Sequence, residues 1–317
     1  MSEKIKLPIL VGPTASGKSA LALRIAAECN CEIVSCDSMQ IYKRMNIGTA
    51  KPTAAEMSQI RHYLVGFVDP TENFSCADYA RLASAAIEDI VARGKTPLVV
   101  GGTGLYLDAL LRGGLAKEAD TDEDYREELR QLALKKGNEY VHGLLAEVDP
   151  ESAAATHPNN LKRVIRALEI YRVCGIPKSE LDKQNASVDG IYEPLAAGLF
   201  YDDRQALYDR IDRRVDIMLE EGLLDEVREL MIEGLFEHSV TAAGAIGYKE
   251  LLGYLRGECT REEAVEELKR STRRYAKRQL TWFGAKDYIE RVTVETPITD
   301  EGLEKIVKKL KKVFQFC

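Results

Sequence analysis

The sequence predicts an α/β fold, in which a doubly wound parallel sheet forms the core and an all-helical insertion interrupts it. Three observations predict this fold. A short apolar run at 7–11 is followed by a glycine-rich loop and a helix-forming segment. Strand-like and helix-like segments then alternate up to residue 112, which is typical of a parallel sheet with helices on both faces. A further apolar run at 195–201 follows a long stretch whose pattern is helical only.

The expected strands of the first part lie at 7–11, 32–36, near 62–68 and at 96–101. Helices are expected at 17–29, 76–93 and 104–112. Between 122 and 183 only helices are expected, at 124–136, 138–148, 150–156, 160–174 and 179–184. After a polar turn region at 185–192 and the strand at 195–201, long helices follow, including an amphipathic one over 305–312. We therefore divide the chain into a first core part (1–115), a helical insertion suited to a lid (116–192) and a second core part with a helical C-terminal region (193–317).

The segment 12–19 reads G-P-T-A-S-G-K-S, the phosphate-binding pattern of P-loop and ATP-binding proteins. The N–H groups of such a loop point inward, and the start of the following helix adds partial positive charge. Lys18 can reach a terminal phosphate, and Ser19 can ligate Mg²⁺. The predicted phosphate-binding residues of the loop are Gly12, Pro13, Thr14, Ala15, Ser16, Gly17, Lys18 and Ser19.

Two polar side chains follow two other predicted strands. Asp37 comes directly after the run at 33–36, and Thr103 lies in G-G-T-G after the run at 97–100. Because ligands bind outside the carboxyl ends of parallel strands, both are expected at the rim that carries the loop. Asp37 can accept a proton or bind Mg²⁺ through water, and Thr103 can approach a phosphate, although either could instead cap the segment that follows it. The missing acid after 97–100 argues against simple nucleotide hydrolysis.

Together with further motifs in the same order, these segments resemble the bacterial tRNA dimethylallyltransferases. The shared elements are the loop at 12–19, D-S-M-Q-I-Y at 37–42, G-G-T-G-L-Y at 101–106, N-L-K-R-V-I-R-A-L-E at 160–169, the arginines of R-I-x-x-R at 210–214, G-Y at 247–248 and K-R-Q-L-T-W at 277–282. The resemblance covers roughly residues 8–285. The loop alone is generic, whereas the ordered set is specific to that family.

The resemblance implies transfer of a dimethylallyl group from dimethylallyl diphosphate to N6 of the adenosine just 3′ of the anticodon in tRNA, with release of diphosphate. It implies that the loop binds the prenyl diphosphate rather than ATP, and that Mg²⁺ is the cofactor. Lys18, Mg²⁺ held by Ser19 and the loop amides would then stabilise the leaving pyrophosphate. Asp37 is the candidate base for the acceptor amine, and Thr103 is carried over as a partner of the transferring oxygen.

Two arginines on one helix complete the implied diphosphate site. Arg210 and Arg214 are four residues apart, so they share a helix face and can clamp the diphosphate. The sequence alone leaves a second interpretation open, in which both form surface ion pairs with the acids at 209, 212 or 216.

The resemblance also implies contact with the tRNA anticodon stem-loop. The residues carried over for this contact are Asp37, Ser38, Met39, Gln40, Thr103, Arg126, Lys162, Arg163, Arg166, Lys277, Arg278 and Gln279. Several belong to a basic stretch, 269–278, whose cations cover about half of a helix circumference. This stretch can contact RNA phosphates, or it can be a solvated face balanced by the glutamates at 262–267.

Composition limits the remaining possibilities. A net charge of −7 does not by itself suggest nucleic acid, so an RNA surface must be local. Seven scattered cysteines without C-x-x-C spacing predict reduced thiols, a cytoplasmic protein and no zinc finger. No apolar run is long enough to span a bilayer, and we expect a monomer. Prenyl transfer to free adenine nucleotides, a small-molecule kinase of the P-loop class and a nucleotide-dependent binding module remain as alternative functions.

Overall fold

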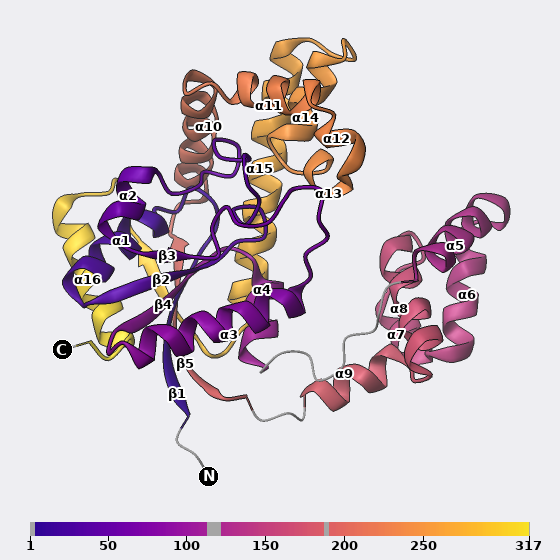
Figure 1. The fold of residues 1–317 in the computed structure, drawn as a ribbon, viewed down its shortest axis with the longest axis horizontal. Coiled ribbons are helices and arrows are strands. Elements are labelled where there is room, and N and C mark those ends of the chain that lie inside the picture. Colours follow the sequence, from indigo (N-terminus) through magenta and orange to yellow (C-terminus); the bar gives the residue numbers. More distant parts are fainter. Residues whose placement is uncertain (1–3, 113–121, 187–189, 317) are drawn as a thin grey trace. The chain divides into compact units, whose positions relative to one another are not determined.

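The computed structural model describes residues 4–112, 122–186 and 190–316 (Figure 1). Two compact units are present, one of residues 1–111 with 191–317 and one of residues 112–190, and each is described by itself. The expected boundary at 115–116 lies outside the described residues. The second core part begins before residue 193, because Tyr192 already pairs with Ile5 in the sheet.

The larger unit is built on a parallel sheet of six strands in the order β3-β2-β4-β1-β5-β6. The strands are β1 (Ile5–Val11), β2 (Cys31–Cys36), β3 (His62–Tyr63), β4 (Thr96–Gly101), β5 (Tyr192–Tyr201) and β6 (Ile289–Val294). β1 lies between β4 and β5, and its last residue, Val11, is level with Gly101 and Gly198. The doubly wound parallel sheet predicted from the sequence is confirmed.

Two strands differ from the sequence-based expectation. β3 has only two residues, because Leu64 and Gly66 both adopt a φ of 62° and the chain leaves the sheet there. β6 lies where only long helices are expected. It is an edge strand that exposes Glu290, Arg291 and Thr293, so its apolar signal is reduced to three buried residues.

Helices cover both faces of the sheet (Figure 1). On one face, α3 (Cys76–Ala92) and α4 (Gly104–Leu111) pack Tyr79, Ile87 and Leu107 against the buried strands. On the other face, α1 (Lys18–Glu28) and α16 (Asp300–Val313) contribute Ile25 and Leu310 to a second core. A short helix, α2 (Ala54–Gln59), precedes β3. Burial of these apolar stripes is the main term that holds the sheet and helices together.

The larger unit has a second group of helices after β5. Its helices are α10 (Arg204–Glu220), α11 (Leu223–Ile232), α12 (Leu235–His238), α13 (Val240–Ala243), α14 (Tyr248–Leu255) and α15 (Arg261–Gly284). Their shared core includes Val227, Leu251 and Leu268, and it also buries Ile41 and Met45 from the segment after β2. Part of the segment from 41 to 52 is therefore packed on these helices.

A buried contact explains the G-Y motif at 247–248. The Tyr248 ring is buried, and its hydroxyl donates a hydrogen bond of 2.7 Å to Glu226 on α11. The same carboxylate accepts the backbone N–H groups of Asn46 at 2.9 Å, Ile47 at 2.9 Å and Gly48 at 3.2 Å. Glu226 thereby attaches the segment after β2 to the helices, because a carboxylate that accepts several N–H groups is strongly held.

The smaller unit consists of helices, as expected for the insertion. They are α5 (Glu123–Lys136), α6 (Asn138–Val148), α7 (Pro150–Ala155), α8 (Leu161–Cys174) and α9 (Lys178–Ala186). Leu129, Val141, Leu145, Val164 and Leu168 form its core. In neither unit, within the described residues, is any helix both long and apolar enough to cross a membrane.

Candidate active site

The phosphate-binding loop, 12–19, connects β1 to α1 as the sequence predicts. It turns back on itself: the Ser16 N–H donates to the Pro13 carbonyl at 3.3 Å, and Ala15 and Gly17 have φ values of 61° and 87°. A side chain at Gly17 would be strained in that conformation. Thr14 to Ser19 line a cavity of about 1090 Å³, whereas Gly12 and Pro13 are buried.

Lys18 contacts the backbone of its own loop. Its Nζ donates to the Pro13 carbonyl at 3.2 Å. Burial lowers the pKa of Lys18 to about 8, the charge of Arg214 acts in the same direction, and the Asp37 carboxylate opposes both. An anion bound in the loop would favour the charged form of Lys18, because an opposite charge nearby stabilises the ammonium.

Both predicted clamp arginines reach the loop from α10. Arg210 Nε donates to the Ala15 carbonyl at 3.1 Å, and Arg214 lies 3.4 Å from the Thr14 hydroxyl. Burial lowers the pKa of Arg214, and the nearby Asp37 carboxylate opposes that effect. Among the acids that the sequence offered as partners, Asp212 and Asp216 instead pair with α15, at 2.6 Å to Arg273 and 2.7 Å to Lys269.

Asp37 caps a turn, which is one of the interpretations that the sequence left open, and it also lines the cavity. Its Oδ1 accepts the backbone N–H groups of Met39 at 2.9 Å and Gln40 at 3.3 Å, so it caps the turn after β2. The residue also lines the cavity together with Lys18 and Arg214. A carboxylate held by the backbone beside two cations is well placed to act on a substrate in that cavity.

Thr103 connects the two turns that follow β2 and β4. Its hydroxyl oxygen accepts the N–H of Ser38 at 2.9 Å and lies 3.3 Å from the Ser38 hydroxyl. Tyr275 on α15 hydrogen-bonds to the Thr103 side chain. Ser38 itself lines the cavity, so Thr103 supports the cavity wall from behind.

The other predicted RNA-binding residues of the larger unit divide into two groups. Met39 and Gln40 line the cavity, and Lys277 and Arg278 are exposed on α15, where Arg278 also lines the cavity. Gln40 also donates to the Ala50 carbonyl at 2.9 Å, which holds the segment from 41 to 52. Gln279 differs from its neighbours because it is only 5% exposed and both ends of its carboxamide are bonded within the protein.

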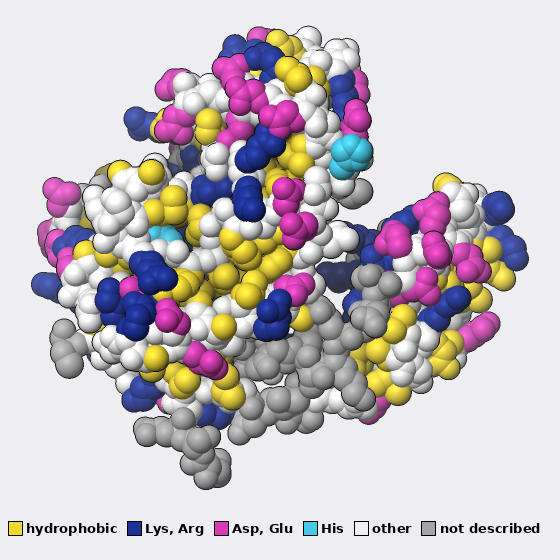
Figure 2. Space-filling view, viewed as in Figure 1, with side chains coloured by type: hydrophobic (Ala, Val, Ile, Leu, Met, Phe, Trp, Pro, Cys, Tyr) yellow, Lys and Arg dark blue, Asp and Glu magenta, His cyan; other side chains and the backbone are white. Residues whose placement is uncertain are grey.

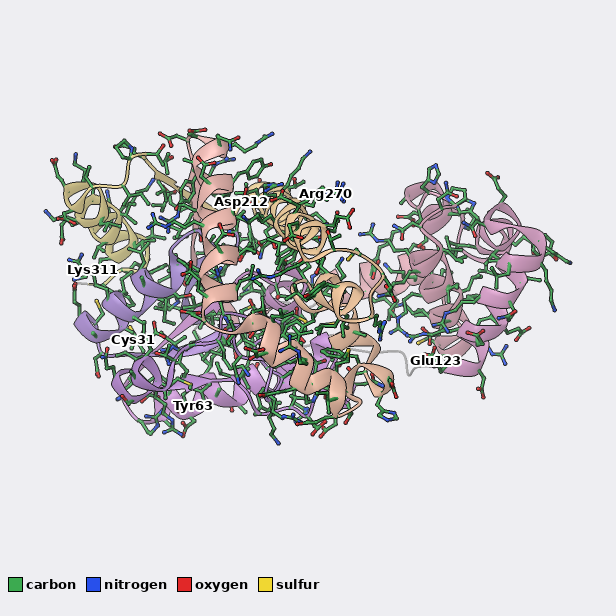
Figure 3. All side chains as sticks on the ribbon, turned by 90° about the horizontal axis from the view of Figure 1, so that it is seen from above. Cys31, Tyr63, Glu123, Asp212, Arg270 and Lys311 are labelled. Carbon is green, nitrogen blue, oxygen red and sulfur yellow. The ribbon has the colours of Figure 1, made fainter. Side chains whose placement is uncertain are left out.

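The basic stretch of α15 is partly neutralised by acids. Lys269 and Arg273 pair with α10, and Arg270 pairs with Glu267. Figure 3 shows Asp212 and Arg270 on these neighbouring helices, and Figure 2 shows basic and acidic side chains interspersed on the visible face of the larger unit. The exposed cations toward the end of the stretch are Arg274, Lys277 and Arg278.

The remaining predicted RNA-binding residues lie in the smaller unit. Lys162 and Arg163 are exposed at the start of α8. Arg126 and Arg166 instead pair with Glu169, at 2.9 Å and 2.6 Å, and this carboxylate is fully buried. The Asp122 N–H donates to it at 2.7 Å. Both arginines, which the resemblance implies as RNA contacts, are thus held in orientation by one buried acid.

Lys51 and Tyr275 are among the cavity-lining residues that the sequence-based set did not include. Lys51 lines the cavity and donates to the Tyr42 carbonyl at 2.6 Å and to Asn46 at 2.8 Å. Burial lowers its pKa to about 8, with Glu226 opposing. Tyr275 lines the cavity although its position on α15 suggests only packing. A lysine in the otherwise uncharged segment 45–55 is the signal that points to Lys51.

The fold and the site together define a P-loop α/β protein with a cavity at its phosphate-binding loop. The family model described as IPP transferase matches residues 40–286. The chain belongs to this family.

Relatives match over nearly the full length. A tRNA dimethylallyltransferase of Thermoanaerobacter sp. (strain X514) is 45% identical, over 98% of this chain and 99% of that protein. A tRNA dimethylallyltransferase of Geobacillus thermodenitrificans is 46% identical, over 100% of this chain and 96% of that protein. The full-length tRNA isopentenylpyrophosphate transferase of Bacillus halodurans has a similar structure, with 43% sequence identity and a TM-score of 0.71. The match covers 98% of this chain and 97% of that one. The structure of a eukaryotic dimethylallyltransferase described as acting on tRNA has 32% sequence identity and a TM-score of 0.75. The match covers 92% of this chain and 74% of that one.

Proposed function

We propose that this chain is a tRNA dimethylallyltransferase whose phosphate-binding loop holds dimethylallyl diphosphate and whose Asp37 receives the proton of the acceptor amine. Family membership makes the chain an enzyme of prenyl transfer to tRNA. The observation that carries the residue assignment is that Lys18, Arg214 and Asp37 line one cavity at the end of β1 and β2. Leaving-group stabilisation and proton acceptance are the two tasks this transfer needs.

The part of the site that would hold the prenyl donor, here called the donor side, carries positive charge that can stabilise the leaving diphosphate. When the bond between the prenyl carbon and oxygen breaks, negative charge develops on that oxygen. Lys18 and the loop N–H groups would stabilise this charge, and Arg210 and Arg214 contact the loop from α10. Such fixed donors act most strongly in a cavity shielded from water.

A divalent metal fits this donor side. Mg²⁺ binds through one or two protein oxygens, substrate phosphates and several waters, and it does not need a cage of protein ligands. Ser19, exposed at the start of α1, and Asp37 both line the cavity, and the described residues contain no cluster of three His, Cys, Asp or Glu side chains that could hold a metal. Bound there, Mg²⁺ would neutralise charge on the diphosphate.

The acceptor is N6 of the adenosine 3′ of the anticodon. Its lone pair forms the new bond to the prenyl carbon as the carbon–oxygen bond breaks, and the nitrogen then loses a proton. Asp37 takes that proton in this proposal. Its Oδ1 is engaged by Met39 and Gln40 N–H groups, which orients the carboxyl group in the cavity. Ser38 and Thr103 support the same wall.

A radiolabel transfer assay tests the proposed function. Purified protein is offered dimethylallyl diphosphate or ATP as donor, with an unmodified tRNA transcript or AMP as acceptor. Label should pass from dimethylallyl diphosphate to tRNA alone. Transfer to AMP at a comparable rate would show an enzyme of free nucleotides, and label passing from ATP would show a kinase.

Binding of the donor should consume protons at alkaline pH. With a Lys18 pKa of about 8, roughly three quarters of the lysines are neutral at pH 8.5, and a bound diphosphate restores their charge. The expected uptake is on the order of half a proton per dimethylallyl diphosphate, with affinity falling as pH rises above 8. Calorimetry in buffers of different ionisation enthalpy measures this proton uptake. Lys18→Ala should remove the uptake, and an unchanged uptake would exclude Lys18 as its source.

The exposed cations of α15 should contribute to tRNA binding. Replacing Lys277 and Arg278 by Gln should weaken binding and reduce the slope of log K against log salt by about 1.4–1.8, since each phosphate contact contributes roughly −0.7 to −0.9. Affinity for dimethylallyl diphosphate should change little in Lys277→Gln alone, because Lys277 is not among the described residues that line the cavity, whereas Arg278 is. Lys305→Gln on α16 is the matched control, because Lys305 is an exposed lysine paired with Glu301. Unchanged tRNA affinity and slope in the double variant would leave this surface without an RNA role.

A further inference from the structure

One face of α15 rests against the turn that follows β4. Tyr275, Gln279 and Trp282 are spaced by four and three residues, so they point to the same side of the helix. Tyr275 bonds to the side chain of Thr103, and Gln279 Nε2 donates to the Gly102 carbonyl at 2.9 Å. A Cβ atom on Gly104 would lie 2.2 Å from the Trp282 indole nitrogen. The helix and the turn are therefore in close contact along three consecutive residues.

The other end of the Gln279 carboxamide holds the phosphate-binding loop. Its Oε1 accepts the Thr14 N–H at 2.9 Å. The Gly102 carbonyl can only accept a hydrogen bond and the Thr14 N–H can only donate one, so each end of the amide fits one partner alone. This buried side chain is thus a bridge of fixed orientation between two turns, one after β1 and one after β4.

We propose that Gln279 is a positioning residue, which sets the separation between the loop that holds the prenyl diphosphate and the turn that carries Thr103. This inference rests on the proposed function. The loop belongs to the donor side, and Thr103 supports Ser38 and the wall near Asp37 on the acceptor side. Reaction requires the prenyl carbon and the amine at a defined distance, and a misplacement of about 1 Å can cost about 100-fold in rate.

Gly102 provides an independent test of the same contact. A Cβ atom there would lie 2.2 Å from Gln279 Nε2 and 3.5 Å from the Gly12 carbonyl. The first distance forces the carboxamide to move, whereas the second is an ordinary contact. Gly102→Ala should therefore act through Gln279, and a small side chain at residue 279 should remove the conflict.

The first experiment separates turnover from binding. Gln279→Met keeps the volume but loses both hydrogen bonds, and we expect kcat to fall about 100-fold while the dissociation constants of dimethylallyl diphosphate and tRNA stay within about threefold of wild type. Thr281→Val, an exposed change on the same helix where the hydroxyl bonds only to the Lys277 carbonyl, should be neutral. A kcat within threefold of wild type in Gln279→Met would overturn the proposal. A selective loss of tRNA affinity would also overturn it and make Gln279 an RNA contact.

The second experiment uses Gln279→Glu. The ionised carboxylate can accept from Thr14 but faces the Gly102 carbonyl without a proton to donate. When protonated, the carboxyl group donates to Gly102 and accepts from Thr14, as the amide does. The rate of this variant relative to wild type should therefore rise as pH falls, whereas the ratio for Gln279→Met should stay flat. A flat ratio for Gln279→Glu would contradict the bridging role, even if Gln279→Met does not fold.

The third experiment is a double-mutant cycle. Gly102→Ala should lower kcat in the wild-type background and cost nothing further in Gln279→Ala, because the conflicting carboxamide is gone. Additive losses would show that Gly102 and Gln279 act separately. These outcomes are distinct from failure of the proposed function, which would appear as wild-type protein that transfers no prenyl group to tRNA.

Discussion

Replacing Asp37 by Asn should slow prenyl transfer to tRNA by about 10²–10⁴, the usual cost of losing a general base. The amide oxygen of Asn can still accept the N–H groups of Met39 and Gln40, so the turn after β2 should keep its conformation. The variant loses the basic oxygen that would take the N6 proton. Single-turnover assays with labelled dimethylallyl diphosphate and saturating tRNA measure the effect.

Donor binding provides the control for Asp37→Asn. The Asp37 carboxylate raises the pKa of Lys18, so its loss makes Lys18 less charged at alkaline pH. Assays near pH 6.5 keep that indirect effect small, and dimethylallyl diphosphate should then bind nearly as in wild type. If transfer stays within a few-fold of wild type, Asp37 is a structural cap and another group takes the proton.

Lys18→Ala should damage both donor binding and chemistry. The loop N–H groups remain, but the charge that faces the leaving diphosphate is lost, and the removal of one such donor typically costs about 10²–10³ in rate. Lys18→Arg keeps the charge with a different shape, so it should retain part of the donor affinity but not the full rate. Equilibrium binding and single-turnover kinetics on both variants separate the two effects.

The identity of the donor is tested with the same protein. ATP should compete poorly with dimethylallyl diphosphate for wild type, and neither variant should gain ATP affinity. Tight ATP binding with steady hydrolysis in the absence of RNA would contradict a prenyl-donor site and favour a kinase or a nucleotide switch.

Local patterns predicted the donor side well. The run at 7–11, the loop and the following helix are contiguous in sequence, so β1, 12–19 and α1 were expected almost residue by residue. Asp37 and Thr103 were placed correctly at one rim because the carboxyl ends of parallel strands share an edge. Their mutual connection through Ser38 could not be predicted, because it depends on two turns that are distant in sequence.

Other features could not be predicted from the sequence, because they depend on tertiary contacts between distant segments. Gln279 follows two exposed cations and reads as part of a basic motif, yet a shift of 100° per residue turns it onto the buried side with Ala276 and Phe283. Lys269 and Arg273 look like RNA contacts until α10 supplies their acids. Glu169 likewise gave no signal that it would be buried between two arginines of the smaller unit.

The position of β5 beside β1 has a consequence for synthesis of the chain. β1 carries the phosphate-binding loop, but one of its two neighbours, β5, is made only after the whole insertion, and the arginines of α10 come later still. At roughly 5–20 residues per second, the ribosome exposes β1 for on the order of ten seconds or more before β5 can pair with it. A nascent chain that ends within the insertion therefore has an open sheet edge and no arginine at the loop. The proposed diphosphate site is therefore complete only late in translation, when the C-terminal half has emerged.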